Sequence, residues 1–170
     1  MSLEAFKTRV LPVKNKLFRF AYRLVNSEEE AKDIVQDVMI KVWNNRENMD
    51  QTRNMEAWCM TLTRNLSLDR LKSKHLGHQE IETQYDLANP LATPYRSTEM
   101  SDTMHRVNEL IEGLPSKQKQ IIILRDVEGM TYKEISKVLE IDINQVKVNL
   151  FRARRSVREN LTEINSYGLS

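Results

Sequence analysis

Hydrophobic residues recur every three or four positions along most of this chain, which is the spacing of α-helices that bury one face. The clearest case is residues 131–155, where two short helical patterns are separated by about three residues. Thr131 and Glu134 have the spacing of a capping box for the first helix, and Asp142 and Gln145 have it for the second. The pattern therefore predicts two helices joined by a tight turn.

The second of these helices has one apolar face and one basic face. The expected buried stripe is Val146, Leu150, Ala153 and Val157. At ~100° per residue, the outward residues are Asn144, Lys147, Val148, Phe151, Arg152, Arg155 and Arg158. From Ile143 to Arg158 there are five basic side chains and no acidic one. Cations on such a helix can displace phosphate counterions while its leading residues, including Gln145, reach base edges in the major groove. We interpret it as a DNA-recognition helix, against the alternative of a solvated amphipathic helix.

Three further helices are expected before residue 75. Residues 4–25 predict one apolar helix that is rich in aromatic side chains. Ser27 and the three glutamates after it predict the start of a second helix that runs to about Trp43. A third helix begins at Met55. The expected inward residues are Ala31, Ile34, Val35, Val38 and Val42 in the second helix, and Met55, Trp58, Cys59, Leu62 and Leu66 in the third.

Each of the last two helices also has a polar surface. The second carries Asp33, Gln36, Asp37 and Lys41 on the side opposite its apolar stripe. One flank of the third carries Thr61, Asn65, Leu68 and Lys72, which can address a ligand together. Polar helix faces are usually just solvated, so these positions alone predict no partner.

The chain as a whole reads as all-α, with four glycines, four prolines and no convincing run of alternating residues. Charge is uneven: residues 76–114 carry seven acidic and two basic side chains. Residues 76–102 also hold two prolines and lack apolar periodicity, which is typical of a linker. We expect two small helical domains, residues 1–75 and 103–164, joined by a flexible acidic linker at 76–102 and followed by a tail at 165–170.

Enzymatic functions find no support in the residue inventory. The three histidines lie in or beside the linker, no glycine-rich phosphate loop exists, and no carboxylate pair accompanies a nucleophile. The single cysteine, Cys59, is predicted to be buried and to pack as a small hydrophobic side chain. A metal site made by Cys59, His75 and His78 is a weak alternative. No apolar run approaches the ~20 residues that span a bilayer, and no signal peptide is evident. We expect a cytoplasmic protein with no cofactor, metal, small-molecule substrate or membrane insertion.

Three segments together resemble the extracytoplasmic-function (group 4) sigma factors of the sigma-70 family, which direct bacterial RNA polymerase to promoters. AKDIVQDVMIKVW resembles the polymerase-binding helix of that family. MEAWCMTLTRNLSLDRLKSK resembles its promoter-melting helix, and the segment from LPSKQKQ to RRSVREN resembles its C-terminal helix-turn-helix. The resemblance covers nearly the whole chain, with the motifs in the family's order.

The resemblance implies a role for each surface. It makes residues 1–75 sigma region 2, which binds polymerase and melts the −10 element, and residues 103–164 sigma region 4, which binds the −35 element. The implied polymerase contacts are Asp33, Gln36, Asp37 and Lys41. The implied −10 contacts are Met49, Thr61, Arg64, Asn65, Arg70 and Lys72, with Met49 lining a pocket for an extruded base and Asn65 bonding a non-template base. Core RNA polymerase, promoter DNA and an anti-sigma factor are the implied partners.

The chain departs from the family pattern at three positions. Glu140 stands where glycine is usual in the turn, Gln145 replaces a common threonine, and Asn149 occupies a position that is often basic. Two other classes remain as alternatives: a stand-alone helix-turn-helix regulator that acts as a dimer, and a helical interaction protein that never binds DNA. The first leaves the polar face of residues 33–41 unexplained, and the second leaves the basic recognition helix unexplained.

Overall fold

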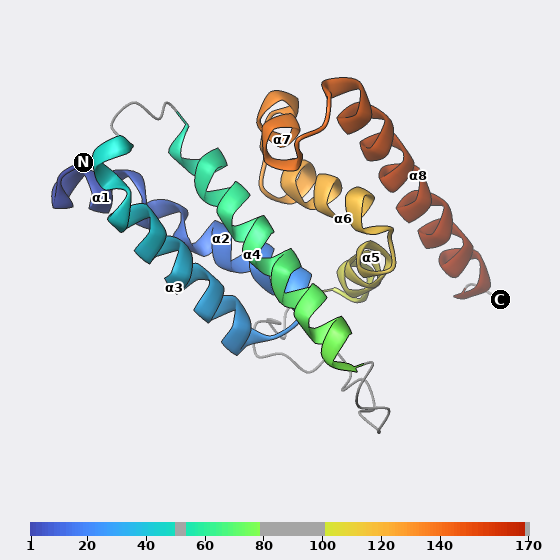
Figure 1. Cartoon of the computed structure of the whole chain (residues 1–170). Coiled ribbons are helices and arrows are strands. Elements are labelled where there is room, and N and C mark those ends of the chain that lie inside the picture. The colour runs from blue at the N-terminus through green and yellow to red at the C-terminus, as the bar shows by residue number, and fades with distance from the viewer. Residues whose placement is uncertain (50–53, 79–100, 169–170) are drawn as a thin grey trace. The chain divides into compact units, whose positions relative to one another are not determined.

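The computed structural model describes residues 1–49, 54–78 and 101–168 of the chain, and it is drawn in Figure 1. Every regular element within these ranges is helical and none is a strand, so the all-α prediction is confirmed. The chain divides into two compact units, one made mainly of the helices before residue 79 and one made mainly of those after residue 100.

The N-terminal unit consists of α1 (Leu3–Arg9), a 3-10 turn (Leu11–Val13), α2 (Lys14–Val25), α3 (Glu28–Asn44), a second 3-10 turn (Arg46–Asn48) and α4 (Met55–His78). The single helix expected over residues 4–25 is therefore wrong, because the chain breaks between α1 and α2. The cause is Pro12, which has no N–H to donate to an α-helical bond and disfavours helical geometry at the residue before it. The chain makes a 3-10 turn there and restarts at Lys14.

Helix α3 forms as the sequence predicts. The Ser27 side chain accepts a hydrogen bond from the backbone N–H of Glu30 at 3.3 Å, which caps the helix. All five residues of its expected inward stripe are buried: Ala31, Ile34, Val35, Val38 and Val42. This aliphatic stripe packs α3 against α2 and α4. It fixes the rotation of α3 and leaves the opposite face exposed.

The buried face of α4 differs from the predicted one. Met55 and Cys59 are buried as expected, but three larger residues are only partly buried: Trp58, Leu62 and Leu66. Thr63 and Ser67 take their place in the core. The Thr63 hydroxyl donates to the Cys59 carbonyl at 2.8 Å, and the Ser67 hydroxyl donates to the Thr63 carbonyl at 2.7 Å. Because these hydroxyls are satisfied within the helix, small polar residues can be buried without a free-energy penalty for a lost partner.

The thiol of Cys59 is fully buried in this core. Burial raises the pKa of Cys59 to about 12, and the nearby charge of Glu56 acts in the same direction. The thiol is therefore neutral at physiological pH and behaves as a small apolar side chain, as the sequence suggests.

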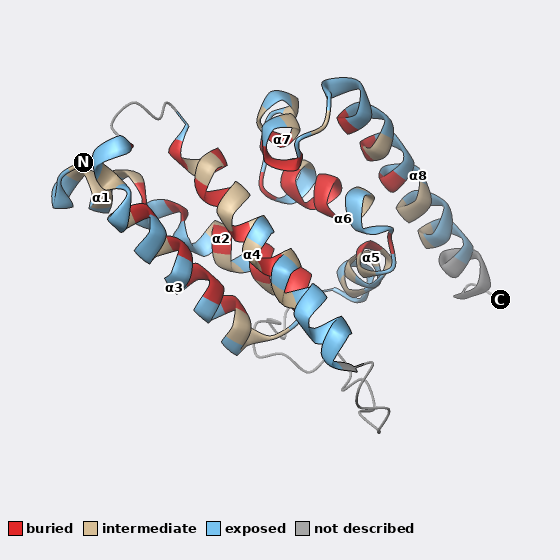
Figure 2. Ribbon diagram, in the orientation of Figure 1, coloured by how far each residue is buried: buried red, intermediate tan, exposed pale blue. Residues whose placement is uncertain are grey.

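The C-terminal unit consists of α5 (Asp102–Glu112), α6 (Ser116–Ile122), a π-helical segment (Ile123–Val127), α7 (Tyr132–Leu139) and α8 (Ile143–Gly168). Helix α8 packs against α5 and α6. The buried apolar residues of this unit are Ile111, Leu114, Ile121, Ile122, Ile123, Leu124, Met130, Ile135, Val146, Leu150 and Ala153. Figure 2 shows the buried positions of α6 and α7 and the separate exposed side of α8.

Helices α7 and α8 form the expected pair with a short turn between them. The capping box is present in both directions: the Thr131 side chain accepts from the Glu134 backbone at 3.1 Å, and the Glu134 carboxylate accepts from the Thr131 backbone at 3.0 Å. The Asp142 carboxylate accepts from the Gln145 backbone at 2.8 Å and caps α8. Between the helices, Glu140 has φ 56° and ψ 45°, in the left-handed region. The predicted helix pair is confirmed, and its turn contains a non-glycine residue in a conformation that favours glycine.

Replacing Glu140 with glycine should stabilise the protein. A left-handed residue with a β-carbon is strained, so Glu140→Gly should raise the free energy of unfolding by about 1 kcal/mol, measured by urea denaturation of the full chain. Glu140→Ala is the matched control, because it removes the carboxylate and keeps the β-carbon. Equal stabilisation by both variants would mean that the charge of Glu140, and not its backbone strain, lowers the stability of the wild-type protein.

Candidate nucleic-acid and protein interfaces

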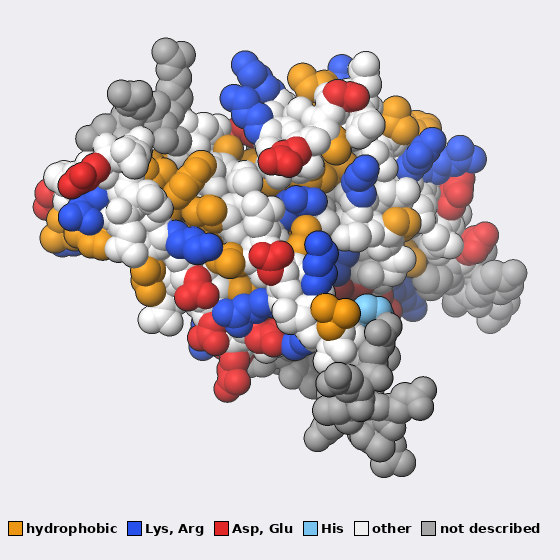
Figure 3. Space-filling view, viewed as in Figure 1, with side chains coloured by type: hydrophobic (Ala, Val, Ile, Leu, Met, Phe, Trp, Pro, Cys, Tyr) orange, Lys and Arg blue, Asp and Glu red, His pale blue; other side chains and the backbone are white. Residues whose placement is uncertain are grey.

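The outward face of α8 is available to a ligand. Val146, Leu150 and Ala153 are buried against the unit, and Val157 is half-buried. The residues assigned to DNA are all exposed: Asn144, Gln145, Lys147, Val148, Phe151, Arg152 and Arg155. Arg158 is exposed as well. Figure 3 shows basic and hydrophobic side chains next to one another over this helix. We call this surface the α8 face.

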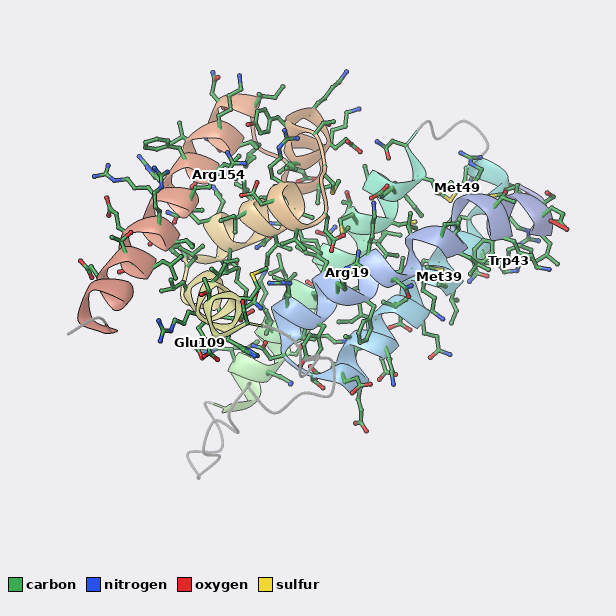
Figure 4. All side chains as sticks on the ribbon, turned by 180° about the vertical axis from the view of Figure 1, so that it is seen from behind. Arg19, Met39, Trp43, Met49, Glu109 and Arg154 are labelled. Carbon is green, nitrogen blue, oxygen red and sulfur yellow. The ribbon has the colours of Figure 1, made fainter. Side chains whose placement is uncertain are left out.

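Two contacts hold the α8 face in position. The Arg154 guanidinium (Figure 4) donates through Nε to the Asp126 carboxylate at 2.9 Å, and this bond raises the pKa of Arg154. The Lys147 ammonium lies 5.9 Å from the centre of the Tyr132 ring at the start of α7. Arg154 thus ties α8 to the π-helical segment, which orients the other cations of the helix.

Two side chains of α8 are engaged within the helix itself. Arg155 donates through Nε to Glu159 at 2.8 Å, which raises the pKa of Arg155. Arg155 must therefore exchange Glu159 for a phosphate if it binds DNA. The Asn149 amide donates to the Gln145 carbonyl at 2.8 Å and is turned back along the helix. This position, which is often basic in the family, adds no cation to the face.

The polar surface of α3 carries the second candidate site. Asp33, Gln36, Asp37 and Lys41 are all exposed, and they form what we call the α3 face. Ile40 belongs to it too, with half of its surface exposed (50%). Sequence reasoning missed Ile40, although its position three residues after Asp37 and four after Gln36 places it on that side of the helix.

Ion pairs connect the α3 face to the basic end of α4. The Arg70 guanidinium lies 3.4 Å from the Asp37 carboxylate and 3.8 Å from that of Asp33. Lys74 pairs with Glu30 at 2.9 Å. Arg70, which the family resemblance gives to DNA phosphates, is therefore beside the carboxylates of the α3 face. Pairs that solvent still reaches, as at these partly exposed side chains, contribute little to stability, roughly 0.2–1 kcal/mol each.

Two of the candidate DNA-binding positions on the flank of α4 are exposed and accessible to a ligand. Asn65 and Lys72 are exposed, whereas Thr61 and Arg64 are half-buried. The Thr61 hydroxyl donates to the Ala57 carbonyl at 2.9 Å. Asn65 therefore presents an amide on the surface, and Lys72 presents a cation two turns further along the helix.

Met49 does not fit the role that the resemblance gave it. Its side chain is 3% exposed and lies in the core after the second 3-10 turn (Figure 4), so no surface of it is open to a base. In the preceding segment, the centres of the Phe6 and Trp43 rings lie 5.4 Å apart in an edge-on arrangement, and the Arg46 guanidinium lies 4.4 Å from the centre of the Trp43 ring. These contacts fix the end of α3 and the turn that precedes Met49. Residues 50–53 lie outside the described residues.

Within residues 1–49, 54–78 and 101–168, no group of three or more histidine, cysteine, aspartate or glutamate side chains is placed to hold a metal ion. No described helix has the length and apolar character to cross a membrane.

Comparison with known proteins gives the same division of the chain. Residues 10–76 match Sigma-70 region 2, and residues 104–157 match Sigma-70 region 4. The chain is 24% identical over 170 residues to the ECF RNA polymerase sigma factor SigW of Bacillus subtilis, covering 95% of this chain and 91% of SigW.

Solved structures show the same fold. The sigma factor RpoE of Bartonella quintana, solved with the anti-sigma factor NepR, matches with a TM-score of 0.80 and 23% identity over 95% of this chain and 99% of that one. CnrH, solved with the cytosolic domain of CnrY, matches with a TM-score of 0.69 and 20% identity over 95% and 90% of the two chains.

The two family matches together span more than two thirds of the chain, and each falls on one of its compact units in the order of the family. Helix α3 and α4 up to residue 76 lie in the first match, and α7 and α8 up to residue 157 lie in the second. The chain belongs to the sigma-70 family of RNA polymerase sigma factors, in the extracytoplasmic-function (ECF) subfamily, and it directs transcription initiation.

Proposed function

We propose that this sigma factor binds core RNA polymerase through its N-terminal unit and reads two promoter elements, one with each unit. Residues 1–75 act on the −10 element and residues 103–164 on the −35 element. Of the linker predicted over 76–102, residues 76–78 belong to α4 and residue 102 begins α5, and residues 79–100 lie outside the described residues. The observation that carries this assignment is the pair of contrasting exposed surfaces: a face with two carboxylates on α3 and a cationic face on α8. Polymerase carries out the chemistry of RNA synthesis, so we assign no catalytic step and no cofactor to this chain.

The α3 face is the proposed polymerase contact. Its polar side chains surround the exposed Ile40, which gives the face the apolar centre and polar rim of a protein interface. Its stripe on the other side is fully buried, so α3 can bind a partner without exposing its own core. Arg70 belongs with this surface, since it already lies beside Asp33 and Asp37.

The flank of α4 is the proposed site for the opened −10 element. A base that leaves the stack needs hydrogen bonds to its edge and a cation near its phosphate. Asn65 offers an amide that both donates and accepts, and Lys72 offers an exposed cation. Thr61 and Arg64 flank them. Met49 is left out of this proposal because its side chain is buried.

The α8 face is the proposed contact with duplex DNA at the −35 element. Lys147, Arg152 and Arg155 supply charge for the phosphates, and the first turns of the helix reach base edges. A stand-alone dimeric regulator could use this helix in the same way, but such a protein has no need of a region 2 match over residues 10–76.

An anti-sigma factor is a further proposed partner. The related RpoE and CnrH were both solved in complexes, the first with an anti-sigma factor and the second with the cytosolic domain of CnrY. A free chain with a cationic helix face would bind DNA nonspecifically, which such a partner prevents. Polymerase and promoter are both in the bacterial cytoplasm, so we place the action of this protein there.

Charge reversal on the α3 face should weaken assembly with polymerase. Asp37→Lys should lower affinity for core RNA polymerase ~10-fold, because it replaces an attractive charge by a repulsive one at the interface. Fluorescence titration of core polymerase measures the effect, and circular dichroism checks that the unit is folded. Glu163→Lys is the matched control, with the same change in charge at an exposed position of α8. Wild-type affinity in an Asp33→Lys/Asp37→Lys double variant would refute the assignment.

The two proposed DNA sites should fail in different ways. Arg152→Ala should weaken closed-duplex binding, by ~1–3 kcal/mol if Arg152 reads a base edge, or uniformly and with a smaller salt dependence if it holds a phosphate. Asn65→Ala should leave that binding nearly unchanged and slow strand opening, because its proposed partner is a base that becomes available only after unpairing. Permanganate footprinting of unpaired thymines, beside a duplex-binding assay, separates the two effects.

One pattern of results would contradict the assignment of duplex binding to α8 and strand opening to α4. If Asn65→Ala weakened closed-duplex binding as much as Arg152→Ala while open complexes formed at the normal rate, the melting role of α4 would be wrong.

A further inference from the structure

The α8 face has an apolar centre, which a purely electrostatic contact with DNA does not explain. Val148 is 46% exposed and Phe151 is 62% exposed. They are three residues apart, so they lie on the same side of the helix, about 4.5 Å apart along its axis. Two large apolar side chains next to each other in water are a feature of binding surfaces.

The groups around these two residues identify what they face. At ~100° per residue, Lys147 and Arg152 lie about 70° to either side of the line midway between Val148 and Phe151. A helix seated in the major groove turns its central line toward the base edges and its flanks toward the two phosphate backbones. The flanking cations therefore suit phosphates, and the apolar pair between them suits the floor of the groove.

The chemistry of the base edges indicates which base these two apolar side chains can contact. The major-groove edges of adenine, guanine and cytosine carry hydrogen-bonding groups, whereas thymine adds a methyl group, the apolar feature of that groove. Val148 and Phe151 have no polar atom with which to satisfy a donor or acceptor. Bases follow one another at ~3.4 Å along a strand, and β-carbons three residues apart on a helix are about 5–6 Å from each other, so the two side chains can address the same or neighbouring base pairs.

We propose that Val148 and Phe151 are specificity-determining residues that read thymine methyl groups in the major groove of the upstream promoter element. This inference rests on the proposed function, because it requires α8 to be the helix that binds that element. The occupant is duplex DNA and not a protein, since cations border the apolar pair on both flanks and complement the charge of the phosphates.

The test removes the methyl group from the DNA. Holoenzyme, made from the full chain and the core polymerase of its host, first selects a promoter from a library randomised in the upstream element. Each thymine of the selected element is then replaced by deoxyuridine, which lacks only the methyl group, and binding is measured by competition. At one or two positions deoxyuridine should lower the affinity about fourfold, the effect of one buried methyl group.

The protein variants complete a double-mutant cycle. Val148→Ala and Phe151→Ala should each bind thymine and deoxyuridine equally well at a position where the wild-type protein discriminates between them. Val127→Ala is the matched control: it alters a valine of similar exposure, 44%, in the π-helical segment. It should keep the full discrimination. All three positions are exposed, and thermal unfolding checks that the variants are folded.

Several results would overturn the inference and leave the proposed function standing. These are a selected upstream element without thymine, an affinity that is indifferent to deoxyuridine at every position, or discrimination that survives in both α8 variants. Loss of anti-sigma binding by Val148→Ala and Phe151→Ala, with intact thymine discrimination, would mean that the apolar pair serves a protein. Failure of the holoenzyme to select any upstream element would instead contradict the proposed function.

Discussion

Burial of a narrow stripe on one side of α8 is the constraint on which its function depends. Val146, Leu150 and Ala153 are buried against α5 and α6, and their spacing fixes how α8 is rotated about its axis. The rotation decides which side chains face outward, so the cations and the pair Val148 and Phe151 are placed by residues that touch no DNA. The Asp142 cap and the ion pair from Arg154 to Asp126 fix the start and the orientation of the helix.

In the N-terminal unit, too, buried residues determine which side chains face outward, but its core has a different composition. Helix α3 buries a row of aliphatic residues, whereas α4 buries small hydroxyl-bearing residues whose donors are satisfied within the helix. Small buried side chains let α4 lie close to α2 and α3, and the ion pairs from Arg70 and Lys74 then link its basic end to the α3 face. On our proposal, a polymerase contact on α3 and a DNA contact on α4 are held in one rigid piece.

The sequence predicted the features that depend on local chemistry. The caps at Ser27, Thr131 and Asp142 and the stripes of α3 and α8 follow from residues within one or two turns of each other. The break at Pro12 was not predicted, because the helical spacing of aromatic residues favoured one continuous helix over residues 4–25 although a proline in such a pattern indicates a break. Other features depend on partners far along the chain: Arg70 lies 33 residues beyond Asp37, and the burial of Met49 follows from tertiary packing. Apolar periodicity predicts that large apolar residues face inward, so it wrongly placed Trp58 in the core. It does not predict that Thr63 and Ser67 can be buried there, because their hydroxyls bond to carbonyls of their own helix.

The central claim is that one chain uses two units to direct polymerase to a bipartite promoter. In vitro transcription with core polymerase on a randomised promoter library tests it most directly. We expect transcripts that require the chain, from promoters that share two sequence elements about two turns of DNA, or ~70 Å, apart. Transcription that is unaffected by the chain, or selection of a single two-fold symmetric site, would contradict the account and favour a dimeric regulator.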